Sequence, residues 1–314
     1  MRHPARTVTR VLYVGGVPRS GSTLTDLMLG QLPGHVGLGE LFYLWHNGPG
    51  RDVQCACGEP FSRCPLWTEV GRLAFGGWPR DLVDEVLRLQ RAVDRTSRIP
   101  LLLVPRLAPA FHRQLVRYGE ILATLYAAVA RASGAQVVVD SSKRPSLAFV
   151  LRRVPDIDLR VAHVVRDPRG VAFSWGKVVA LPTGASHRTE MPRWSAATVS
   201  RRWVTVNAAF VLLSLLGVPR LAVRYEDLVA APRVQLTRIA ALHDLPLTGD
   251  DLSFVTADGL RVASSHVIAG GRIRLAGNLM PLRVDDEWRR SLPVMRRRLV
   301  SGATWPLRWK YGYR

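Results

Sequence analysis

The feature that most constrains the fold is an apolar segment, a glycine-rich turn and a helical segment near the N-terminus. Residues 10–14 predict a short buried strand, and apolar side chains recur at helical spacing over residues 22–31. The turn between them is Gly15-Gly-Val-Pro-Arg-Ser-Gly-Ser-Thr-Leu24. Glycines let successive N–H groups converge, and the helix dipole places its positive end there. Because Arg19 adds a positive charge, the turn is suited to bind an anion rather than only to cap a helix.

Further apolar runs predict the rest of a sheet. Strands are expected at residues 36–38, 136–139, 159–165 and 221–223, and helices at 145–154, 168–178 and 227–242. Strands that alternate with helices predict a parallel sheet covered on both faces. The predicted fold class is therefore α/β, with three layers and a mostly parallel central sheet. In such sheets ligands bind off the carboxyl ends of the strands.

The length of 314 residues fits one large α/β domain. We predict a single domain over residues 1–314, with a variable insertion at about 46–130 that contains the cysteines and two helical patterns. The longest apolar runs, at 99–104 and 210–216, are much shorter than the roughly 20 residues that span a bilayer. The basic N-terminus leads directly into the first strand and lacks a signal core, so we expect a cytoplasmic protein.

The chain is strongly basic, with 44 lysines and arginines against 24 acidic residues, a net charge of +20. Such a balance favours polyanionic partners such as a phosphorylated ligand, an anionic membrane or a nucleic acid. Nearly all of the excess is arginine, which codon bias also explains, so charge alone decides little. A basic nucleic-acid-binding protein remains one alternative, although its aromatic residues would be interleaved with basic ones and here the tryptophans are scattered.

The cysteines all lie in one short stretch, as Cys55, Cys57 and Cys64. With His46 nearby they are one candidate for a Cys₃His zinc site. The spacing C-x-C-x₆-C lacks a second C-x-x-C pair, and an odd count argues against a disulfide framework. The sequence favours a plain turn with a reducible disulfide or three free thiols, and we predict no metal ligands.

The glycine spacing Gly16-x₄-Gly21 is also that of the nucleotide-binding P-loop, with Thr23 where a magnesium-binding hydroxyl would lie. Ser22, however, replaces the lysine that contacts the terminal phosphates. Asp140 ends an apolar strand, where an aspartate could serve as a ligand of magnesium. A P-loop kinase or NTPase that uses Mg-ATP is therefore an alternative, although without the lysine it loses its main charge on the transferred group.

Two motifs together resemble the sulfotransferases of the carbohydrate and tyrosylprotein type. Pro18-Arg-Ser-Gly-Ser-Thr-Leu24 is similar to their 5′-phosphosulfate loop. Residues 164–174 resemble their 3′-phosphate segment, a strand that ends in Arg-Asp-Pro with a serine eight residues after the arginine. Here these two residues are Arg166 and Ser174, and an arginine at a strand end can contact one phosphate together with a serine on the next helix.

Smaller features resemble the same family, whose members have a P-loop-like fold. They are Asp140-Ser-Ser-Lys143, Arg224-Tyr-Glu-Asp-Leu228 and the Gly-Glu pair at Gly39-Glu40. The stretch from His266 to Arg274 is similar to the family's H-x₃-G-N-P-x-R segment, with Gly271 in place of the asparagine.

The resemblance implies transfer of a sulfuryl group from 3′-phosphoadenosine 5′-phosphosulfate (PAPS) to a hydroxyl, without a required metal. It implies Glu40 as general base, and Lys143 and Arg19 as the groups that stabilise the leaving phosphate. The donor-binding residues that it implies are Arg19, Ser20, Gly21, Ser22, Thr23, Leu24, Arg166, Ser174, Tyr225, Gly271, Arg272 and Arg274.

The acceptor pocket is expected from the variable parts, residues 46–130 and 176–194. Leucine and aromatic side chains in these helices favour an apolar or amphiphilic acceptor such as a glycolipid, a terpenoid or another natural product, and a carbohydrate is equally open. We expect a small-molecule or glycan acceptor, and one alternative is an amphiphilic acceptor near a membrane surface. We expect no specific binding of a nucleic acid. His163, inside an apolar strand, is predicted to be a core histidine.

Overall fold

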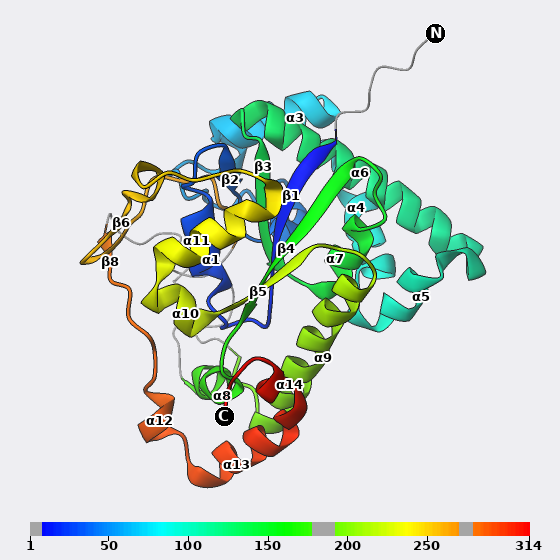
Figure 1. The fold of residues 1–314 in the computed structure, drawn as a ribbon. Coiled ribbons are helices and arrows are strands. Elements are labelled where there is room, and N and C mark those ends of the chain that lie inside the picture. The colour runs from blue at the N-terminus through cyan, green and yellow to red at the C-terminus, as the bar shows by residue number, and fades with distance from the viewer. Residues whose placement is uncertain (1–7, 178–191, 270–278) are drawn as a thin grey trace.

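A five-stranded parallel sheet forms the centre of the structure, a computed structural model that describes residues 8–177, 192–269 and 279–314 (Figure 1). Its order is β2-β3-β1-β4-β5, and every neighbouring pair is parallel. The strands are β1 (Thr9–Gly15), β2 (His35–Gly37), β3 (Val137–Lys143), β4 (Ile157–Val165) and β5 (Arg220–Arg224). The predicted α/β class with a parallel central sheet is confirmed.

Helices cover both faces of the sheet, because side chains alternate between the faces along each strand. On β1, Val11 and Tyr13 belong to one hydrophobic cluster, whereas Leu12 and Val14 belong to another. Figure 1 shows α6, α7 and α9 on the first face and α1, α10 and α11 on the second. The helices are α1 (Ser22–Leu29), α2 (Leu44–Asn47), α3 (Pro65–Phe75), α4 (Arg80–Val93), α5 (Ile99–Leu103), α6 (Pro109–Ser133), α7 (Pro145–Leu151), α8 (Pro168–Gly176), α9 (Ala196–Leu215), α10 (Tyr225–Ala230), α11 (Pro232–Ala240), α12 (Trp288–Ser291), α13 (Val294–Ala303) and α14 (Trp305–Lys310).

The segment predicted as an insertion shares its core with the sheet. The helices α3, α4 and α6 contribute to the cluster that contains Tyr13, and Trp67 and Tyr126 are fully buried in it. Burying such an aromatic side chain stabilises the fold by roughly 1.5–3 kcal/mol. The segment is therefore attached to the sheet by a continuous apolar contact.

The prediction of a single helix over residues 227–242 is wrong. The structure has two helices there, α10 and α11, which meet at Pro232. Proline lacks the N–H that would continue α10, and it restricts the residue before it to a non-helical backbone. Ala231 accordingly has φ −137° and ψ 62°.

A second, antiparallel sheet was not predicted. It consists of β6 (Val255–Thr256), β7 (Gly259–Arg261) and β8 (Leu279–Met280). The pair Asp258-Gly259 between two apolar segments is a hairpin signal that could have revealed it. Gly259 has φ +145°, and a Cβ there would lie 2.2 Å from the Met280 oxygen.

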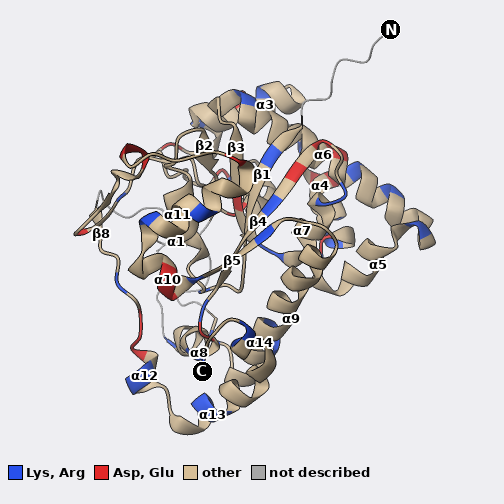
Figure 2. Cartoon of the chain, viewed as in Figure 1, with Lys and Arg blue, Asp and Glu red and all other residues tan. Residues whose placement is uncertain are grey.

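Within the described ranges, none of the helices combines the length and the apolar character needed to cross a membrane. Basic side chains lie on helices on both sides of the sheet and on the C-terminal helices α12 to α14 (Figure 2). The positive charge is thus distributed over much of the molecule.

Candidate active site

The glycine-rich turn connects the carboxyl end of β1 to α1. Gly16 has φ +147°, and a Cβ there would lie 2.3 Å from the Val164 backbone oxygen, so glycine is required. Gly21, with φ +92°, is the N-cap of α1. The turn closes through a hydrogen bond of 3.1 Å from the Ser20 N–H to the Val17 oxygen. We call residues 16–21 the phosphate loop.

Two polar atoms of the phosphate loop are buried without a protein partner. They are the Ser20 hydroxyl oxygen and the Arg19 Nε. Buried polar groups normally have partners, and a helix N-terminus favours an anion. Burial lowers the pKa of Arg19, and the neighbouring Arg166 lowers it further. An anion bound in the loop would satisfy both atoms and offset the two cations, so the loop is suited to bind a group such as phosphate or sulfate.

Lys143 lies beside the phosphate loop because of the sheet register. It is the register partner of Gly15, the last residue of β1. Its backbone φ is +66°, and Arg19 has φ +78°. Residues other than glycine rarely adopt this left-handed backbone conformation, which costs them about 1–2 kcal/mol. Strain of this kind is concentrated at functional sites. Two of the three predicted catalytic residues carry it.

Glu40 and Lys143 are in direct contact. The Lys143 Nζ lies 2.7 Å from the Glu40 Oε1. The Lys143 side chain is 11% exposed and the Glu40 side chain 16%, so the ion pair is partly shielded from water but remains accessible. Glu40 follows β2, and its N–H donates to the Ala269 oxygen at 3.2 Å. The structure therefore brings the predicted base and the predicted cation together at one edge of the sheet.

Asp140 holds the β3 end in place. It is fully buried and accepts hydrogen bonds from the Tyr126 hydroxyl at 2.5 Å and from the Ser142 N–H at 2.8 Å. The Ser142 hydroxyl also accepts from the Phe42 N–H at 2.9 Å. Burial raises the Asp140 pKa to about 6. These contacts connect β3 to the turn that carries Glu40, which makes Asp140 a positioning residue.

Arg166, at the end of β4, contacts the phosphate loop directly. Its Nη1 donates to the Arg19 backbone oxygen at 3.1 Å. Its guanidinium lies 4.7 Å from the centre of the Tyr225 ring. The Tyr225 ring in turn packs on Gly21, where a Cβ would lie 2.4 Å from it. The first and second motifs, 147 residues apart in the sequence, thus meet in space.

Ser174, the partner predicted for Arg166, is buried on α8. The helix begins after Asp167, whose carboxylate accepts from the Arg169 N–H and pairs with its guanidinium at 2.6 Å. The Asp167 N–H donates to Glu226, which also accepts from the Tyr313 hydroxyl at 2.6 Å. Glu226 therefore has a structural role at the base of α8.

Ser22, Thr23 and Leu24 form the first turn of α1, directly after the phosphate loop. Ser22 is buried, and Leu24 packs into the apolar cluster on that face. The predicted residues Gly271, Arg272 and Arg274 lie outside the described residues.

Two contacts at the site were not predicted. Asp285 accepts from the Arg166 Nη2 at 3.0 Å through both its backbone and its side-chain oxygen. The Trp175 Nε1 donates to the Pro18 oxygen at 3.2 Å, and its ring stacks on that of Trp194 at 3.6 Å. No motif marks Asp285, and the only signal for Trp175 is its position next to Ser174.

His163 is a core histidine, as predicted. Its Nε2 hydrogen-bonds the Asn207 Oδ1 at 2.8 Å, and its Nδ1 accepts from Arg220 at 3.0 Å. Burial and the nearby guanidinium lower its pKa to about 3. It is therefore neutral and unsuited to act as a second base.

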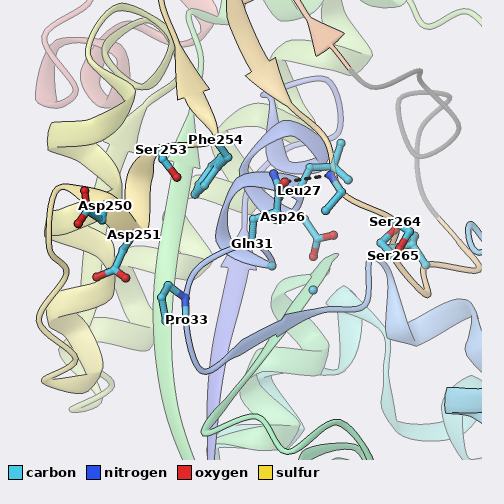
Figure 3. A pocket seen from close by; sticks show the side chains of 14 residues that line it. Asp26, Leu27, Gln31, Pro33, Asp250, Asp251, Ser253, Phe254, Ser264 and Ser265 are labelled. Carbon is cyan, nitrogen blue, oxygen red and sulfur yellow. Dashed lines mark hydrogen bonds between the residues drawn. The ribbon is translucent and has the colours of Figure 1, made fainter.

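A pocket of about 440 Å³ lies beside the C-terminal half of α1 and the residues that follow it (Figure 3). It is lined by Asp26, Gln31 and Phe254, among others, and by none of the predicted site residues. Asp26 accepts from the Gly39 N–H at 3.2 Å, and burial raises its pKa to about 7. Asp26 thereby fixes the backbone next to Glu40. The residues that line the pocket include aspartates but no arginine or lysine that could bind an anion.

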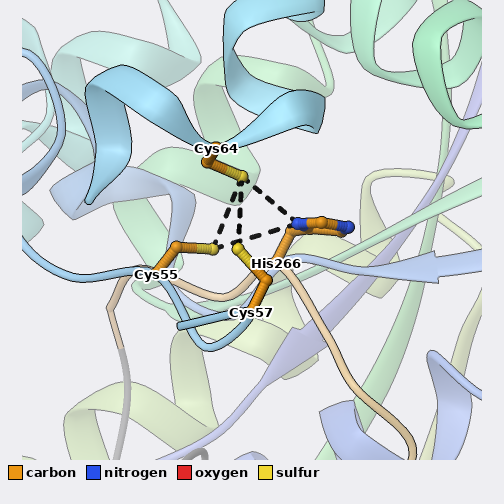
Figure 4. A group of neighbouring side chains, drawn as sticks. All are labelled: Cys55, Cys57, Cys64 and His266. Carbon is orange, nitrogen blue, oxygen red and sulfur yellow. Dashed lines mark hydrogen bonds between the residues drawn. The ribbon is translucent and has the colours of Figure 1, made fainter. Parts of the chain in front are cut away.

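The three cysteines lie together and are free thiols. The histidine beside them is His266, whereas His46, which the sequence analysis considered, is exposed and hydrogen-bonds Asn47 (Figure 4).

Comparisons with known proteins show the family to which the chain belongs. The model of the sulfotransferase family matches residues 12–249. The sulfotransferase domain from the curacin biosynthetic pathway superimposes with a TM-score of 0.50 at 16% identity, over 99% of each chain. The sulfotransferase domain of the Synechococcus PCC 7002 olefin synthase has a TM-score of 0.48 and 20% identity, over 96% of this chain and 97% of that one. A search of curated proteins finds no match. Because the family model covers most of the sequence, including the phosphate loop, Lys143 and Arg166, the chain belongs to the sulfotransferase family.

Proposed function

We propose that this protein transfers a sulfuryl group from PAPS to a hydroxyl group of an acceptor, with Glu40 as general base. The observation that carries the proposal is the ion pair between Glu40 and Lys143, which lies one strand from a phosphate loop with unpartnered buried donors. Sulfuryl transfer needs a base, a cation and an anion-binding site, and all three lie close together at the carboxyl ends of the strands.

The phosphate loop would hold the 5′-phosphosulfate end of the donor. The Ser20 hydroxyl and the Arg19 Nε are the two atoms with unmet hydrogen-bonding capacity. When bound, the donor supplies an activated sulfuryl group whose leaving group is a phosphate. The Arg19 backbone oxygen accepts a hydrogen bond from Arg166, and the Arg19 guanidinium lies 5.9 Å from the centre of the Trp175 ring. These contacts place its positive charge at the loop before the donor binds.

Arg166 and Ser174 would bind the 3′-phosphate, which distinguishes PAPS from donors that lack it. Arg166 is 6% exposed, and its guanidinium is oriented by Tyr225 and Asp285. A preoriented guanidinium loses little entropy when it binds a phosphate through two hydrogen bonds.

Glu40 would take the proton of the acceptor hydroxyl. In the structure its Oε1 accepts a hydrogen bond from Lys143. An anion in the phosphate loop competes for the same ammonium, and a carboxylate without its counter-ion is a stronger base. Lys143 thus serves two negative groups, and it stabilises the charge that develops on the leaving phosphate as Glu40 takes up the proton.

An amphiphilic acceptor near a membrane surface is supported by the C-terminal helices. Met295, Leu299, Trp305 and Trp309 are exposed, from 47% to 73% of their surface. Arg296 and Arg298 are exposed beside them on α13. Exposed tryptophan and basic side chains together favour contact with an anionic lipid surface. Co-sedimentation with anionic and neutral vesicles tests this, and equal retention on both would contradict it.

The experiment that tests the proposed function is transfer from ³⁵S-labelled PAPS to a panel of hydroxyl acceptors, including glycolipids and sugars, without added metal. We expect labelled product with the wild-type protein and loss of it with Glu40→Gln. The matched control is Glu120→Gln, because the Glu120 side chain is 62% exposed on α6 and lies outside the site. Transfer of phosphate from Mg-ATP instead would identify a kinase.

A further inference from the structure

A group of four potential metal ligands lies outside the catalytic residues. The sulfurs of Cys55, Cys57 and Cys64 and a ring nitrogen of His266 all lie within 4.8 Å of one another (Figure 4). Figure 4 shows the four side chains pointing toward a common centre. The Cys64 sulfur is 3.7 Å from each of the other two sulfurs. The His266 Nδ1 is 3.2 Å from the Cys64 sulfur and 4.0 Å from the Cys55 sulfur.

These distances agree with ligands around a tetrahedral ion and disagree with a disulfide. Zinc–sulfur bonds of about 2.3 Å and zinc–nitrogen bonds of about 2.0 Å place tetrahedral ligands about 3.8 Å apart for two sulfurs and about 3.5 Å for sulfur and nitrogen. The sulfur atoms of a disulfide are only about 2.05 Å apart. The observed separations therefore correspond to a space that one ion fills.

The local backbone is built to hold this arrangement. The Cys55 N–H donates to the Glu59 oxygen at 2.8 Å, and the Gly58 N–H donates to the Cys55 oxygen at 3.0 Å. Gly58 has φ +95°, which lets the chain turn tightly between the cysteines. Cys64 is the N-cap of α3, and both Cys55 and Cys64 are fully buried.

His266 is brought to the cysteines by contacts of its own backbone. The Trp67 Nε1 donates to the His266 oxygen at 2.8 Å, and the Ala56 N–H donates to the Val267 oxygen at 2.9 Å. His266 and Cys64 are 202 residues apart in the sequence, so the four ligands meet only through the fold.

We propose that Cys55, Cys57, Cys64 and His266 bind one zinc ion. Three thiolates and one imidazole are a ligand set that zinc prefers, and four protein ligands leave no open position, which is typical of a structural rather than a catalytic site. This departs from the expectation that the cysteines bind no metal, and it replaces His46 with His266 as the fourth ligand.

The site would position the catalytic base. The segment that begins at His266 continues to Ala269, whose oxygen accepts the Glu40 N–H at 3.2 Å. Gly39 packs against the same segment so closely that a Cβ would lie 2.4 Å from the Ala269 oxygen. A metal that fixes His266 to the cysteine loop therefore also fixes the backbone that carries Glu40.

The test is the metal content of the full-length protein, purified without chelator and measured by inductively coupled plasma mass spectrometry. We expect about one zinc per chain, and a cobalt-substituted protein with the ligand-field and thiolate charge-transfer absorption of a tetrahedral sulfur site. Zinc well below one per chain, with three titratable thiols or with a mass two daltons lower for a disulfide, would overturn the proposal. This measurement needs only the wild-type protein.

Variants then identify the ligands. We expect Cys64→Ser and His266→Ala to lose most of the zinc, His266→Cys to keep it, and the control His46→Ala to keep it in full. Retention of zinc by Cys64→Ser and His266→Ala, or its loss in His46→Ala, would contradict the assignment. Because metal content is measured without substrate, failure of this proposal and failure of the sulfotransferase proposal are distinguishable.

Discussion

The ammonium of Lys143 and the carboxylate of Glu40 lie 2.7 Å apart, at the ends of neighbouring regions of the sheet, β3 and the turn after β2. The first prediction tests the roles of this pair. Glu40→Gln should lower kcat by about 10²–10⁴-fold, the usual contribution of a general base, and leave donor affinity nearly unchanged. Steady-state kinetics and donor titration separate the two effects. Full turnover by Glu40→Gln would remove Glu40 as the base.

The left-handed backbone of Lys143 gives a second prediction. Its φ of +66° strains any residue except glycine. Lys143→Gly and Lys143→Ala should both lose most activity, because both lack the ammonium. Lys143→Gly should nevertheless be more stable than Lys143→Ala, by about 1 kcal/mol, since glycine relieves the strain. Chemical denaturation of the two variants measures this difference, and a more stable alanine variant would show that the backbone is not strained.

The contact between Gly21 and Tyr225 gives a third prediction. An alanine Cβ at Gly21 would lie 2.4 Å from the Tyr225 ring, so Gly21→Ala should displace the ring and weaken donor binding. In a double-mutant cycle, Tyr225→Ala should relieve part of this clash, which makes the two effects on stability non-additive. Additive effects in denaturant unfolding would mean that the ring does not limit the loop.

Asp26 gives a prediction for pH dependence. Burial raises its pKa from 3.8 to about 7, so the folded state holds the proton more tightly than the unfolded state between about pH 4 and pH 7. Its contribution to stability is therefore present at low pH and is lost as the pH rises through this window. Asp26→Asn keeps an acceptor for the Gly39 N–H but has no charge to bury.

We expect Asp26→Asn to be more stable than wild type at pH 8, by up to about 4 kcal/mol, and to lose this advantage toward pH 4. Asp94, whose pKa burial raises to about 6, is present in both proteins and cancels in the comparison. The Asp140 carboxylate raises the Asp26 pKa further, so its repulsion of Asp26 is part of the difference that the comparison measures. An equal difference in unfolding free energy at pH 4 and pH 8 would contradict the assignment.

Arg166 should determine the preference for a 3′-phosphate. Arg166→Ala should weaken binding of 3′,5′-adenosine bisphosphate by about 10- to 100-fold, as expected for a lost charged hydrogen bond, and should affect 5′-AMP much less. The control is Arg63→Ala, because the Arg63 side chain is 74% exposed. An equal loss for both nucleotides would place Arg166 elsewhere than at the 3′-phosphate.

The local features of this site could be predicted from the sequence. The apolar strand, the glycine turn and the helix around the phosphate loop have the periods and the turn residues that the structure shows. The sheet order then explains why Lys143 lies beside Gly15, because parallel strands align their carboxyl ends. Glu40 and Arg166 were found through a family resemblance, and the structure brings both to the same edge.

Contacts between distant segments could not be predicted. Asp285 pairs with Arg166 across 119 residues, and neither its neighbours nor its spacing marks it. His266 was compared only with the H-x₃-G-N-P-x-R segment of the family, so its contact with the cysteines was missed and the nearby His46 was considered instead. Sequence proximity suggested the wrong histidine, because tertiary structure determines which ligands meet.

The most direct test of the central claim is calorimetric titration of the wild-type protein with 3′,5′-adenosine bisphosphate, the product that PAPS leaves, with and without magnesium. We expect binding at one site per chain, with equal affinity in both conditions, and much weaker binding of ADP and 5′-AMP. Binding of ATP that requires magnesium, with no binding of the bisphosphate, would contradict it.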